Sequence, residues 1–164
     1  MQIMSEKNPD IKQAAMAIIE SQHVMTIASA DNGSPWAAPV YYIFYDGSFY
    51  FFSKPDSRHI TDTMNTGKAA ASIHADSSGW ADIRGIQMSG VISAAGINRT
   101  SGNAFKNYIK RFNFISEIKN VASSAKDIGS LESAFKVKFY KLTPVSLFYL
   151  DNSIRFGFKE SVFL

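Results

Sequence analysis

The sequence predicts a mainly β (α+β) protein with flanking helices, folded as a single domain over residues 1–164. Aromatic residues make up 13% of the chain, and strands favour such broad side chains because they fill a pleated surface. The dipeptides Asn32-Gly33 and Asp46-Gly47 separate apolar runs, as hairpin turns do. Gly85 and Gly90 lie inside a long alternating run. Glycines inside a strand indicate the bends that a closed or partly closed barrel needs.

The first elements follow from caps and periodicity. Asn8-Pro9-Asp10 resembles a helix start, because Asn can cap free backbone N–H groups and Pro fits the first helical position. Apolar residues at positions 11, 14, 15, 18 and 19 then share one helical face, and this helix is predicted to end near Gln22. Strands are predicted over residues 24–29, 37–45 and 48–53, joined by the two Gly-containing turns in meander order.

The remaining elements are predicted from similar signals. A short helix capped by Asp56 or Ser57 should end near Asn65, with Gly67 as its stop. The pattern predicts strands over residues 69–74 and 83–94, a helix over 99–114, a poorly patterned polar segment over 116–130, and strands over 135–141 and 145–150 around Thr143-Pro144.

The aromatic strand ending at Phe52 leads directly into the turn Ser57-Arg58-His59 at a predicted helix start. A hydroxyl, a guanidinium and free helix N-terminal amides suit a phosphate. Ser53 and Lys54 add a second hydroxyl and a second cation close by. These residues therefore predict an anion site next to a flat apolar strand. The alternative is a helix cap followed by ordinary surface residues, and spacing alone does not decide between the two.

Other functional classes find little support. The chain has no Cys, which excludes disulfides and thiolate metal sites, and its three histidines lack the spacing of a metal site, so none is predicted. No Gly-rich phosphate loop or Gly-x-Ser-x-Gly elbow occurs. Trp80 could stack on a ring or only pin a loop. The charge is −4 over residues 1–82 and +7 over 83–164, and the basic half could face nucleic acid, an anionic cofactor or only solvent.

No signal peptide or membrane span is visible, so we expect a cytoplasmic protein that binds neither membrane nor nucleic acid.

Several segments, taken in succession, resemble the pyridoxamine phosphate oxidase-like family of flavin-binding split barrels, especially its small bacterial members. The matching segments are HVMTIAS, SPWAAPVYYIFYDGSFYFFS, SRH, KAAASI, IRGIQMSGVI and FYKLTPVSLFYLDN. The resemblance implies a six- or seven-stranded antiparallel split barrel that forms a homodimer and binds FMN in clefts at the subunit interface. It implies that the flavin ring lies against the backbone of two strands and that the turn holds its phosphate.

The residues that the resemblance assigns to these roles fall into three groups. The ring would contact Val40, Tyr41, Tyr42, Phe52 and Ser53; the phosphate would contact Ser57, Arg58 and His59; Arg84 and Gln87 would be contributed across the interface. No protein residue is expected to act as a catalytic acid or base. The prediction is an FMN-dependent oxidoreductase acting on an unidentified small molecule, and the alternative is a cofactor-free, deazaflavin-binding or haem-binding module of the stress-response type.

The chain also departs from the true oxidases. They carry Arg and Lys on the second strand, where this chain has Ala and Tyr, and they have Lys at the turn position of His59. A histidine there would make phosphate binding more pH-dependent. The oxidases use an Arg-x-His pair near the C-terminus, where this chain has Arg155-Phe156-Gly157. We therefore expect no pyridoxamine phosphate oxidase activity.

Overall fold

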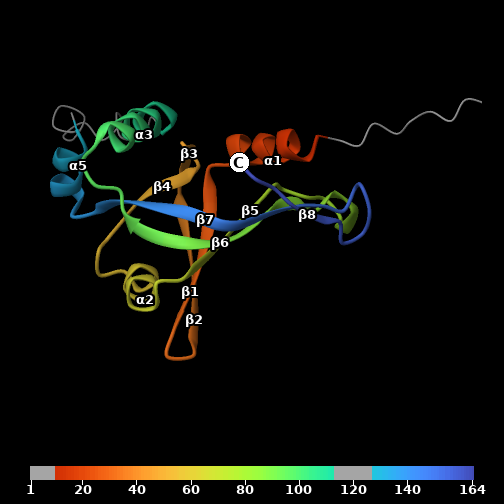
Figure 1. The fold of residues 1–164 in the computed structure, drawn as a ribbon, viewed down its shortest axis with the longest axis horizontal. Helices are drawn as coiled ribbons and strands as arrows, with labels where there is room; N and C mark the ends of the chain where they lie inside the picture. Colours follow the sequence, from red (N-terminus) through yellow and green to blue (C-terminus); the bar gives the residue numbers. More distant parts are fainter. Residues whose placement is uncertain (1–9, 113–126) are drawn as a thin grey trace, which may run out of the picture.

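The computed structural model describes residues 10–112 and 127–164, and within them the chain forms one curled, eight-stranded antiparallel sheet with helices packed around it (Figure 1). The strand order is β2-β1-β5-β6-β7-β4-β3, with β8 pairing β7. The elements are α1 (Ile11–Ser21), β1 (Val24–Asp31), β2 (Ser34–Tyr41), β3 (Ile43–Tyr45), β4 (Ser48–Ser53), α2 (Arg58–Thr66), β5 (Ala69–His74), η1 (Trp80–Asp82), β6 (Arg84–Ala94), α3 (Arg99–Arg111), α5 (Ile128–Phe135), β7 (Lys138–Asp151) and β8 (Lys159–Ser161). This confirms the predicted mainly β, split-barrel fold class.

The two edges of the sheet are formed by neighbouring pieces of chain. β2 pairs with β1 at one edge and β3 pairs with β4 at the other, yet only Tyr42 separates β2 from β3. The Tyr42 side chain is fully buried, and its hydroxyl donates to the Ile19 carbonyl oxygen at 2.8 Å. The prediction of one strand over residues 37–45 in a simple meander was wrong. Burial of Tyr42 divides this segment into β2 and β3, which lie at opposite edges of the sheet. The sheet curls, so that these two edges approach each other.

Gly85 and Gly90 sit where neighbouring backbones come close. An added Cβ at Gly85 would lie 2.5 Å from the Ile73 carbonyl oxygen, and one at Gly90 would press against the Thr143 carbonyl oxygen. The register between β6 and β7 shifts between Ser89 and Gly90. The predicted close approach and bend are therefore confirmed, and the bend belongs to the curvature of the sheet.

Two hydrophobic clusters fill the structure. The larger lies inside the curled sheet under α1, and the smaller joins the ends of β3, β4 and β7 to α3 and α5. Phe52 stacks on Phe139 in the second cluster, with ring centroids 4.5 Å apart. No helix in the described parts of the chain is both long and apolar enough to cross a membrane.

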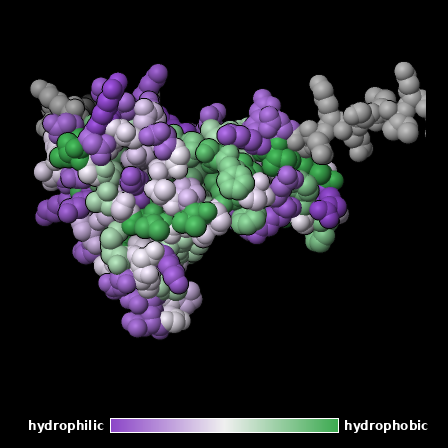
Figure 2. Space-filling view, in the orientation of Figure 1, coloured by the Kyte–Doolittle hydropathy of each residue, from purple (hydrophilic) through white to green (hydrophobic). Residues whose placement is uncertain are grey.

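Hydrophobic residues also reach the surface. Figure 2 shows them gathered over the middle of the molecule, near the place where β6 and β7 run in Figure 1. Val91 on β6 is 45% exposed and Val145 on β7 is 78% exposed. Hydrophilic residues cover the tip of the β1–β2 hairpin in the same view.

The helix boundaries agree with the sequence patterns in most places. Asp10 caps α1 by accepting a hydrogen bond from the Gln13 amide, whereas Asn8 and Pro9 lie outside the described residues. α2 begins after Ser57 and ends at Gly67, which adopts the left-handed conformation with φ of 66°. α3 ends at Arg111 with Phe112 as its non-helical C-cap, so it is shorter than predicted; residues 113 and 114 lie outside the described residues.

The C-terminal third departs most from the predictions. Residues 128–135 form the helix α5, although the sequence predicts a polar segment up to 130 and a strand from 135; Asp127 and Ser130 stabilise its start through a reciprocal capping box. β7 is one continuous strand through Pro144, because the bulge opposite Gly90 accommodates the proline. The three-residue strand β8 was not predicted; it pairs with β7, and its Lys159 Nζ lies over the Phe148 ring of β7, 4.5 Å from the centroid.

Candidate functional site

A hydrogen-bonded cluster lies where β4 runs into α2. The Ser53 Oγ lies 2.8 Å from the His59 Nε2 and 3.0 Å from the Ser57 Oγ. Ser57 donates its hydroxyl to the Lys54 carbonyl oxygen at 2.7 Å. Ser53 and His59 are both buried, each 8% exposed. Of the predicted anion-site residues, Ser53 and Ser57 therefore come together around the His59 imidazole.

The protons of this cluster can be arranged in two ways. Since Ser57 uses its only hydroxyl proton on the Lys54 carbonyl, it acts as an acceptor toward Ser53 or His59. Ser53 then donates either to Ser57 or to the His59 Nε2, according to the imidazole tautomer. Burial lowers the pKa of His59 below its ordinary value, and the Asp62 carboxylate partly opposes this. The cluster can thus turn a donor toward an incoming acceptor by reorienting one hydroxyl.

The first turn of α2 adds backbone donors. Ser57 occupies the N-cap position with extended backbone, but its side chain does not cap a backbone amide of the helix. The amides at a helix start carry partial positive charge and lack partners within the helix. The Ile60 and Thr61 amides donate to the Ser57 carbonyl oxygen at 3.0 Å each. Because the Ser57 hydroxyl is turned toward Lys54, the amides of Arg58 and His59 are the ones that could face a negatively charged group.

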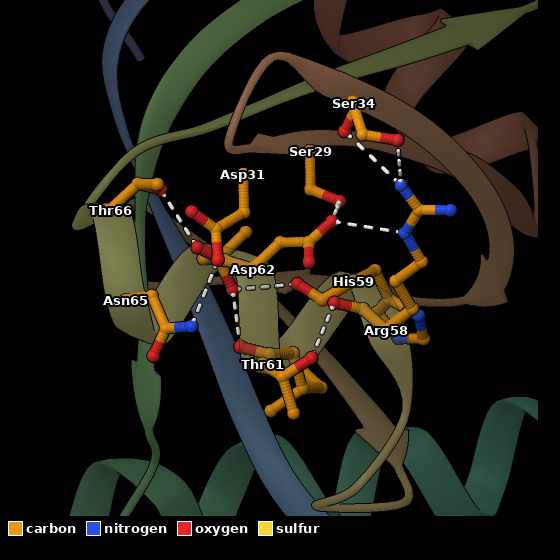
Figure 3. A network of polar contacts seen from close by, with 11 residues as sticks. Ser29, Asp31, Ser34, Arg58, His59, Thr61, Asp62, Asn65 and Thr66 are labelled. Carbon is orange, nitrogen blue, oxygen red and sulfur yellow. Dashed lines mark hydrogen bonds and ion pairs between the residues drawn. The ribbon is translucent and has the colours of Figure 1, made fainter.

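Arg58 points away from this cluster, toward the β1–β2 hairpin (Figure 3). Its Nη2 donates to the Ser34 Oγ at 2.7 Å and to the Ser34 carbonyl oxygen at 3.2 Å. Its Nε lies 3.6 Å from the Asp62 Oδ2, and its guanidinium lies over the Trp36 ring, 4.8 Å from the centroid. The buried Asp62 also accepts from the Ser29 hydroxyl at 2.9 Å. Arg58 therefore ties α2 to the hairpin while 40% of its side chain stays exposed.

The strand residues assigned to ring contacts differ in burial. Val40 is half-buried, Tyr41 is 51% exposed and Tyr42 is fully buried. Phe52 is half-buried against the second hydrophobic cluster, and Lys54 is exposed in the turn.

A family model described as pyridoxamine 5'-phosphate oxidase matches residues 11–134, which is well over half of the chain. The chain belongs to the pyridoxamine 5'-phosphate oxidase family. A UPF0306 protein of Enterobacter sp. (strain 638) is 26% identical over 144 residues, covering 86% of this chain and 88% of that protein. The predicted family membership is thereby confirmed.

Solved structures resemble the fold. A haem-binding protein of Mycobacterium smegmatis superimposes with a TM-score of 0.69 at 17% identity, covering 94% of this chain and 58% of that one, so this chain spans little more than half of its length. A FAD-binding protein of Mesorhizobium loti superimposes with a TM-score of 0.54 at 14% identity, covering 82% of this chain and 88% of that one. At these identities the likeness concerns the fold alone.

The donor set at the start of α2 fits the phosphate of the flavin that the family implies. Hydroxyls, an imidazole and helix amides are donors that phosphate oxygens accept from, and Lys54 adds a cation in the same turn. Arg58 contributes positive charge at the rim, although its Nη2 and Nε already bind the hairpin and Asp62. No group of three His, Cys, Asp or Glu side chains suited to a metal occurs among residues 10–112 and 127–164.

Arg84 and Gln87 lie far from this turn within one chain. Ser53 stands opposite Lys138 at the start of β7, whereas Arg84 stands opposite Asp151 at its end. Nearly the whole length of β7 therefore separates the two places. The Gln87 Oε1 accepts a hydrogen bond from Lys159 Nζ at 3.0 Å. A contribution of these two residues to the turn of the same subunit is excluded by this distance, and their assignment to a partner's site stays a prediction.

Sequence reasoning missed the hairpin side of the site. The β1–β2 hairpin folds beside α2, although more than twenty residues separate the contacting positions in the sequence. This arrangement brings Arg58 and Asp62 into contact with three hairpin residues, Ser29, Ser34 and Trp36. One signal was available for Ser29, a hydroxyl at an otherwise apolar inward position of β1. Such a buried polar group needs a partner, and Asp62 supplies it.

Proposed function

We propose that this protein binds FMN and works as an FMN-dependent oxidoreductase on a small molecule, without pyridoxamine phosphate oxidase activity. The observation that carries the proposal is the Ser53–His59–Ser57 cluster at the start of α2, in a chain that belongs to the pyridoxamine 5'-phosphate oxidase family. A FAD-binding protein among the structural neighbours supports a flavin in this fold.

The chain's own residues have binding and positioning roles in this proposal. The hydroxyls of Ser53 and Ser57 and the first amides of α2 hold the phosphate, while Lys54 and Arg58 neutralise its charge. The backbone of Val40 to Tyr42 and of Phe52 lines the ring. The flavin, when bound, supplies hydride or electron transfer. Binding energy and orientation come from the protein, and no side chain is needed as a catalytic acid or base.

His59 gives the phosphate site a pH dependence that lysine would not give. The imidazole lies 2.8 Å from the Ser53 hydroxyl in a buried setting that lowers its pKa. A phosphate beside it favours the charged form and therefore raises that pKa on binding. FMN binding should accordingly be accompanied by proton uptake.

The proposal is tested first by the absorption spectrum of the purified protein and by titration with FMN. Bound flavin gives two broad visible bands, and heat should release FMN that chromatography identifies. Protein that carries no flavin and gains none at micromolar excess of FMN would refute the proposal.

Arg58→Ala tests the turn itself. Loss of the guanidinium at the rim of the proposed phosphate site should weaken FMN binding about tenfold or more. The matched control is Arg99→Ala, which removes an exposed arginine from the first position of a different helix, α3. Equal FMN affinity in the two variants would remove Arg58 from the site.

We also propose that the protein is a homodimer through the outer face of its sheet. Ala28, Ala70, Ser89 and Ser146 stand opposite one another on four adjacent strands, so this face presents a small, uncharged row. Exposed hydrophobic residues over β6 and β7 continue the same uncharged surface (Figure 2). Exposed uncharged surfaces that include large hydrophobic side chains favour association. Light scattering after size exclusion should give twice the chain mass of 18.1 kDa.

Haem is the second candidate, because a haem-binding protein of Mycobacterium smegmatis superimposes with a TM-score of 0.69. Of the histidines, His23 and His74 are exposed, whereas His59 is buried in its hydroxyl cluster. Haem would give one sharp, intense absorption band in place of the two broad flavin bands. The same spectrum therefore separates the two candidates.

A further inference from the structure

We propose that an apolar cavity between the starts of α3 and α5 is a second ligand site, which takes a small amphipathic carboxylate. The hydrocarbon chain of the ligand fills the cavity, and its head group meets Lys106. The two helices lie together at one end of the sheet (Figure 1). The cavity has a volume of about 420 Å³, within the usual range for small-molecule sites. It shares no residue with the proposed flavin site, so this inference goes beyond the proposed function and does not rest on it.

The walls of the cavity suit a hydrocarbon chain. Its apolar side chains are those of Ile97, Phe105 and Ile128. Phe105 and Ile128 are buried members of the second hydrophobic cluster, whereas Ile97 is 88% exposed. Covering such a side chain with an apolar group is favourable, because it removes hydrophobic surface from water. A ligand with a hydrocarbon body would therefore gain free energy here.

The cavity lies where a helix start usually closes on itself. Asn98 caps α3 through a reciprocal capping box with Ser101. At such starts, a hydrophobic residue just before the cap often packs against the fourth residue of the helix. In α3 these two positions are Ile97 and Gly102. Ile97 therefore has no side chain to pack against at that position, and the missing volume belongs to the cavity.

Neither the backbone nor the packing requires glycine at position 102. Its φ is not among the positive values of the described chain, and an added Cβ would meet no atom within 4 Å. Apart from proline, glycine is the least favourable residue inside a helix. A larger residue would therefore be compatible with α3, and its absence leaves open the space that the ligand needs.

The polar groups of the cavity select the charge of the ligand. Asn98 and Asp127 use their side chains in the two capping boxes. The hydrogen bond from the Ser130 amide lowers the pKa of Asp127, so this carboxylate is ionised and repels an anion at its end of the cavity. Lys106 forms no hydrogen bond or ion pair with another residue in 10–112 or 127–164. Its ammonium group is therefore available to a carboxylate.

The experiment titrates the full chain with octanoate and with octanol, its uncharged counterpart, in an isothermal calorimeter. Octanoate should bind about two- to fivefold more tightly than octanol, as expected for an exposed ion pair. Lys106→Met should remove this difference. The matched control is Lys110→Met, which removes an exposed lysine of the same helix away from the cavity and should leave both affinities unchanged.

Gly102→Leu tests the cavity itself. The leucine would complete the contact with Ile97 and occupy the ligand's place, so both affinities should fall at least about tenfold without a lower thermal unfolding midpoint. Gly102→Ala, which fills less of the cavity, should weaken octanoate binding to a smaller extent and gives a second reading if the leucine variant does not fold. Octanoate binding that is undetectable in the wild type, or unchanged in the Gly102 variants, would overturn the inference.

Two further outcomes are decisive. Octanol binding as tight as octanoate binding would overturn the role of Lys106. Phe105 also packs on Phe52, with ring centroids 6.3 Å apart, and Phe52 is assigned to the flavin ring. Displacement of FMN by octanoate would therefore place both ligands in one site and overturn the inference of a second one. Octanoate binding does not require FMN, so failure of either proposal can be told apart from failure of the other.

Discussion

Gly90→Ala tests whether the curvature of the sheet depends on a missing side chain. Gly90 lies at the register shift between β6 and β7, where its Cα faces the backbone of the neighbouring strand. An added Cβ would press against the Thr143 carbonyl oxygen and lie 3.1 Å from the Pro144 Cα. These are backbone atoms in the middle of a long strand pair, so no flexible side chain can move aside.

The expected loss of stability follows from two opposing terms. Forcing one extra methyl group into a packed interior costs typically about 1–3 kcal/mol. Alanine also reduces the conformational entropy of the unfolded chain, which by itself would raise the free energy of unfolding by about 0.4–1 kcal/mol. The free energy of unfolding should therefore fall by about 1–2 kcal/mol, which for a domain of this size lowers the melting temperature by roughly 2–8 °C.

The assay is thermal and urea unfolding followed by circular dichroism, with Gly102→Ala as the matched control. Gly102 lies inside α3, and an added Cβ there meets no atom within 4 Å. Alanine is better than glycine in a helix interior by about 0.8–1 kcal/mol, so this variant should be more stable than the wild type. The same chemical change thus has opposite expected signs at the two sites. A Gly90→Ala protein as stable as the wild type would refute the close-approach argument.

Two further predictions concern buried polar groups. Burial lowers the pKa of His59 below its ordinary value of 6.5, so on acidification the unfolded chain takes up a proton before the folded chain does. The contribution of neutral His59 to the free energy of unfolding is therefore complete above about pH 6.5 and declines as the pH falls toward the pKa of the folded state. Urea titrations across pH should show a smaller acid-side decline in His59→Gln, and identical pH profiles would contradict the assignment. Tyr42→Phe should lower the free energy of unfolding by about 1–2 kcal/mol in the same assay, since the Ile19 carbonyl oxygen loses its 2.8 Å partner; an unchanged midpoint would show that water replaces the hydroxyl.

Local chemistry made much of the fold predictable. Glycine at positions 33, 47 and 67 takes up positive φ, as the turn and cap signals require. The strands predicted over residues 48–53 and 69–74 coincide with β4 (Ser48–Ser53) and β5 (Ala69–His74). These features depend only on a few neighbouring residues, so they can be predicted from the local sequence.

Local sequence patterns also gave wrong secondary-structure predictions at two places. Residues 37–45 have an unbroken strand pattern, but the burial of Tyr42 against α1 divides them. Phe135 has strong strand propensity, yet it ends α5 because the Asp127–Ser130 capping box and the second hydrophobic cluster stabilise a helix there. Propensity differences are small compared with the packing of a whole helix face, so tertiary contacts decided these elements.

The candidate site also has one part that local sequence predicts and one part that depends on tertiary contacts. The sequence by itself determined the Ser53, Ser57 and His59 cluster, because a strand end and the next helix start are joined by a short turn that keeps them within reach. Only the tertiary structure decided that Arg58 turns to Ser34 and Trp36, since the curl of the sheet brings a hairpin from distant sequence beside α2. Contacts across such separations depend on the closure of the whole barrel, which no local pattern encodes.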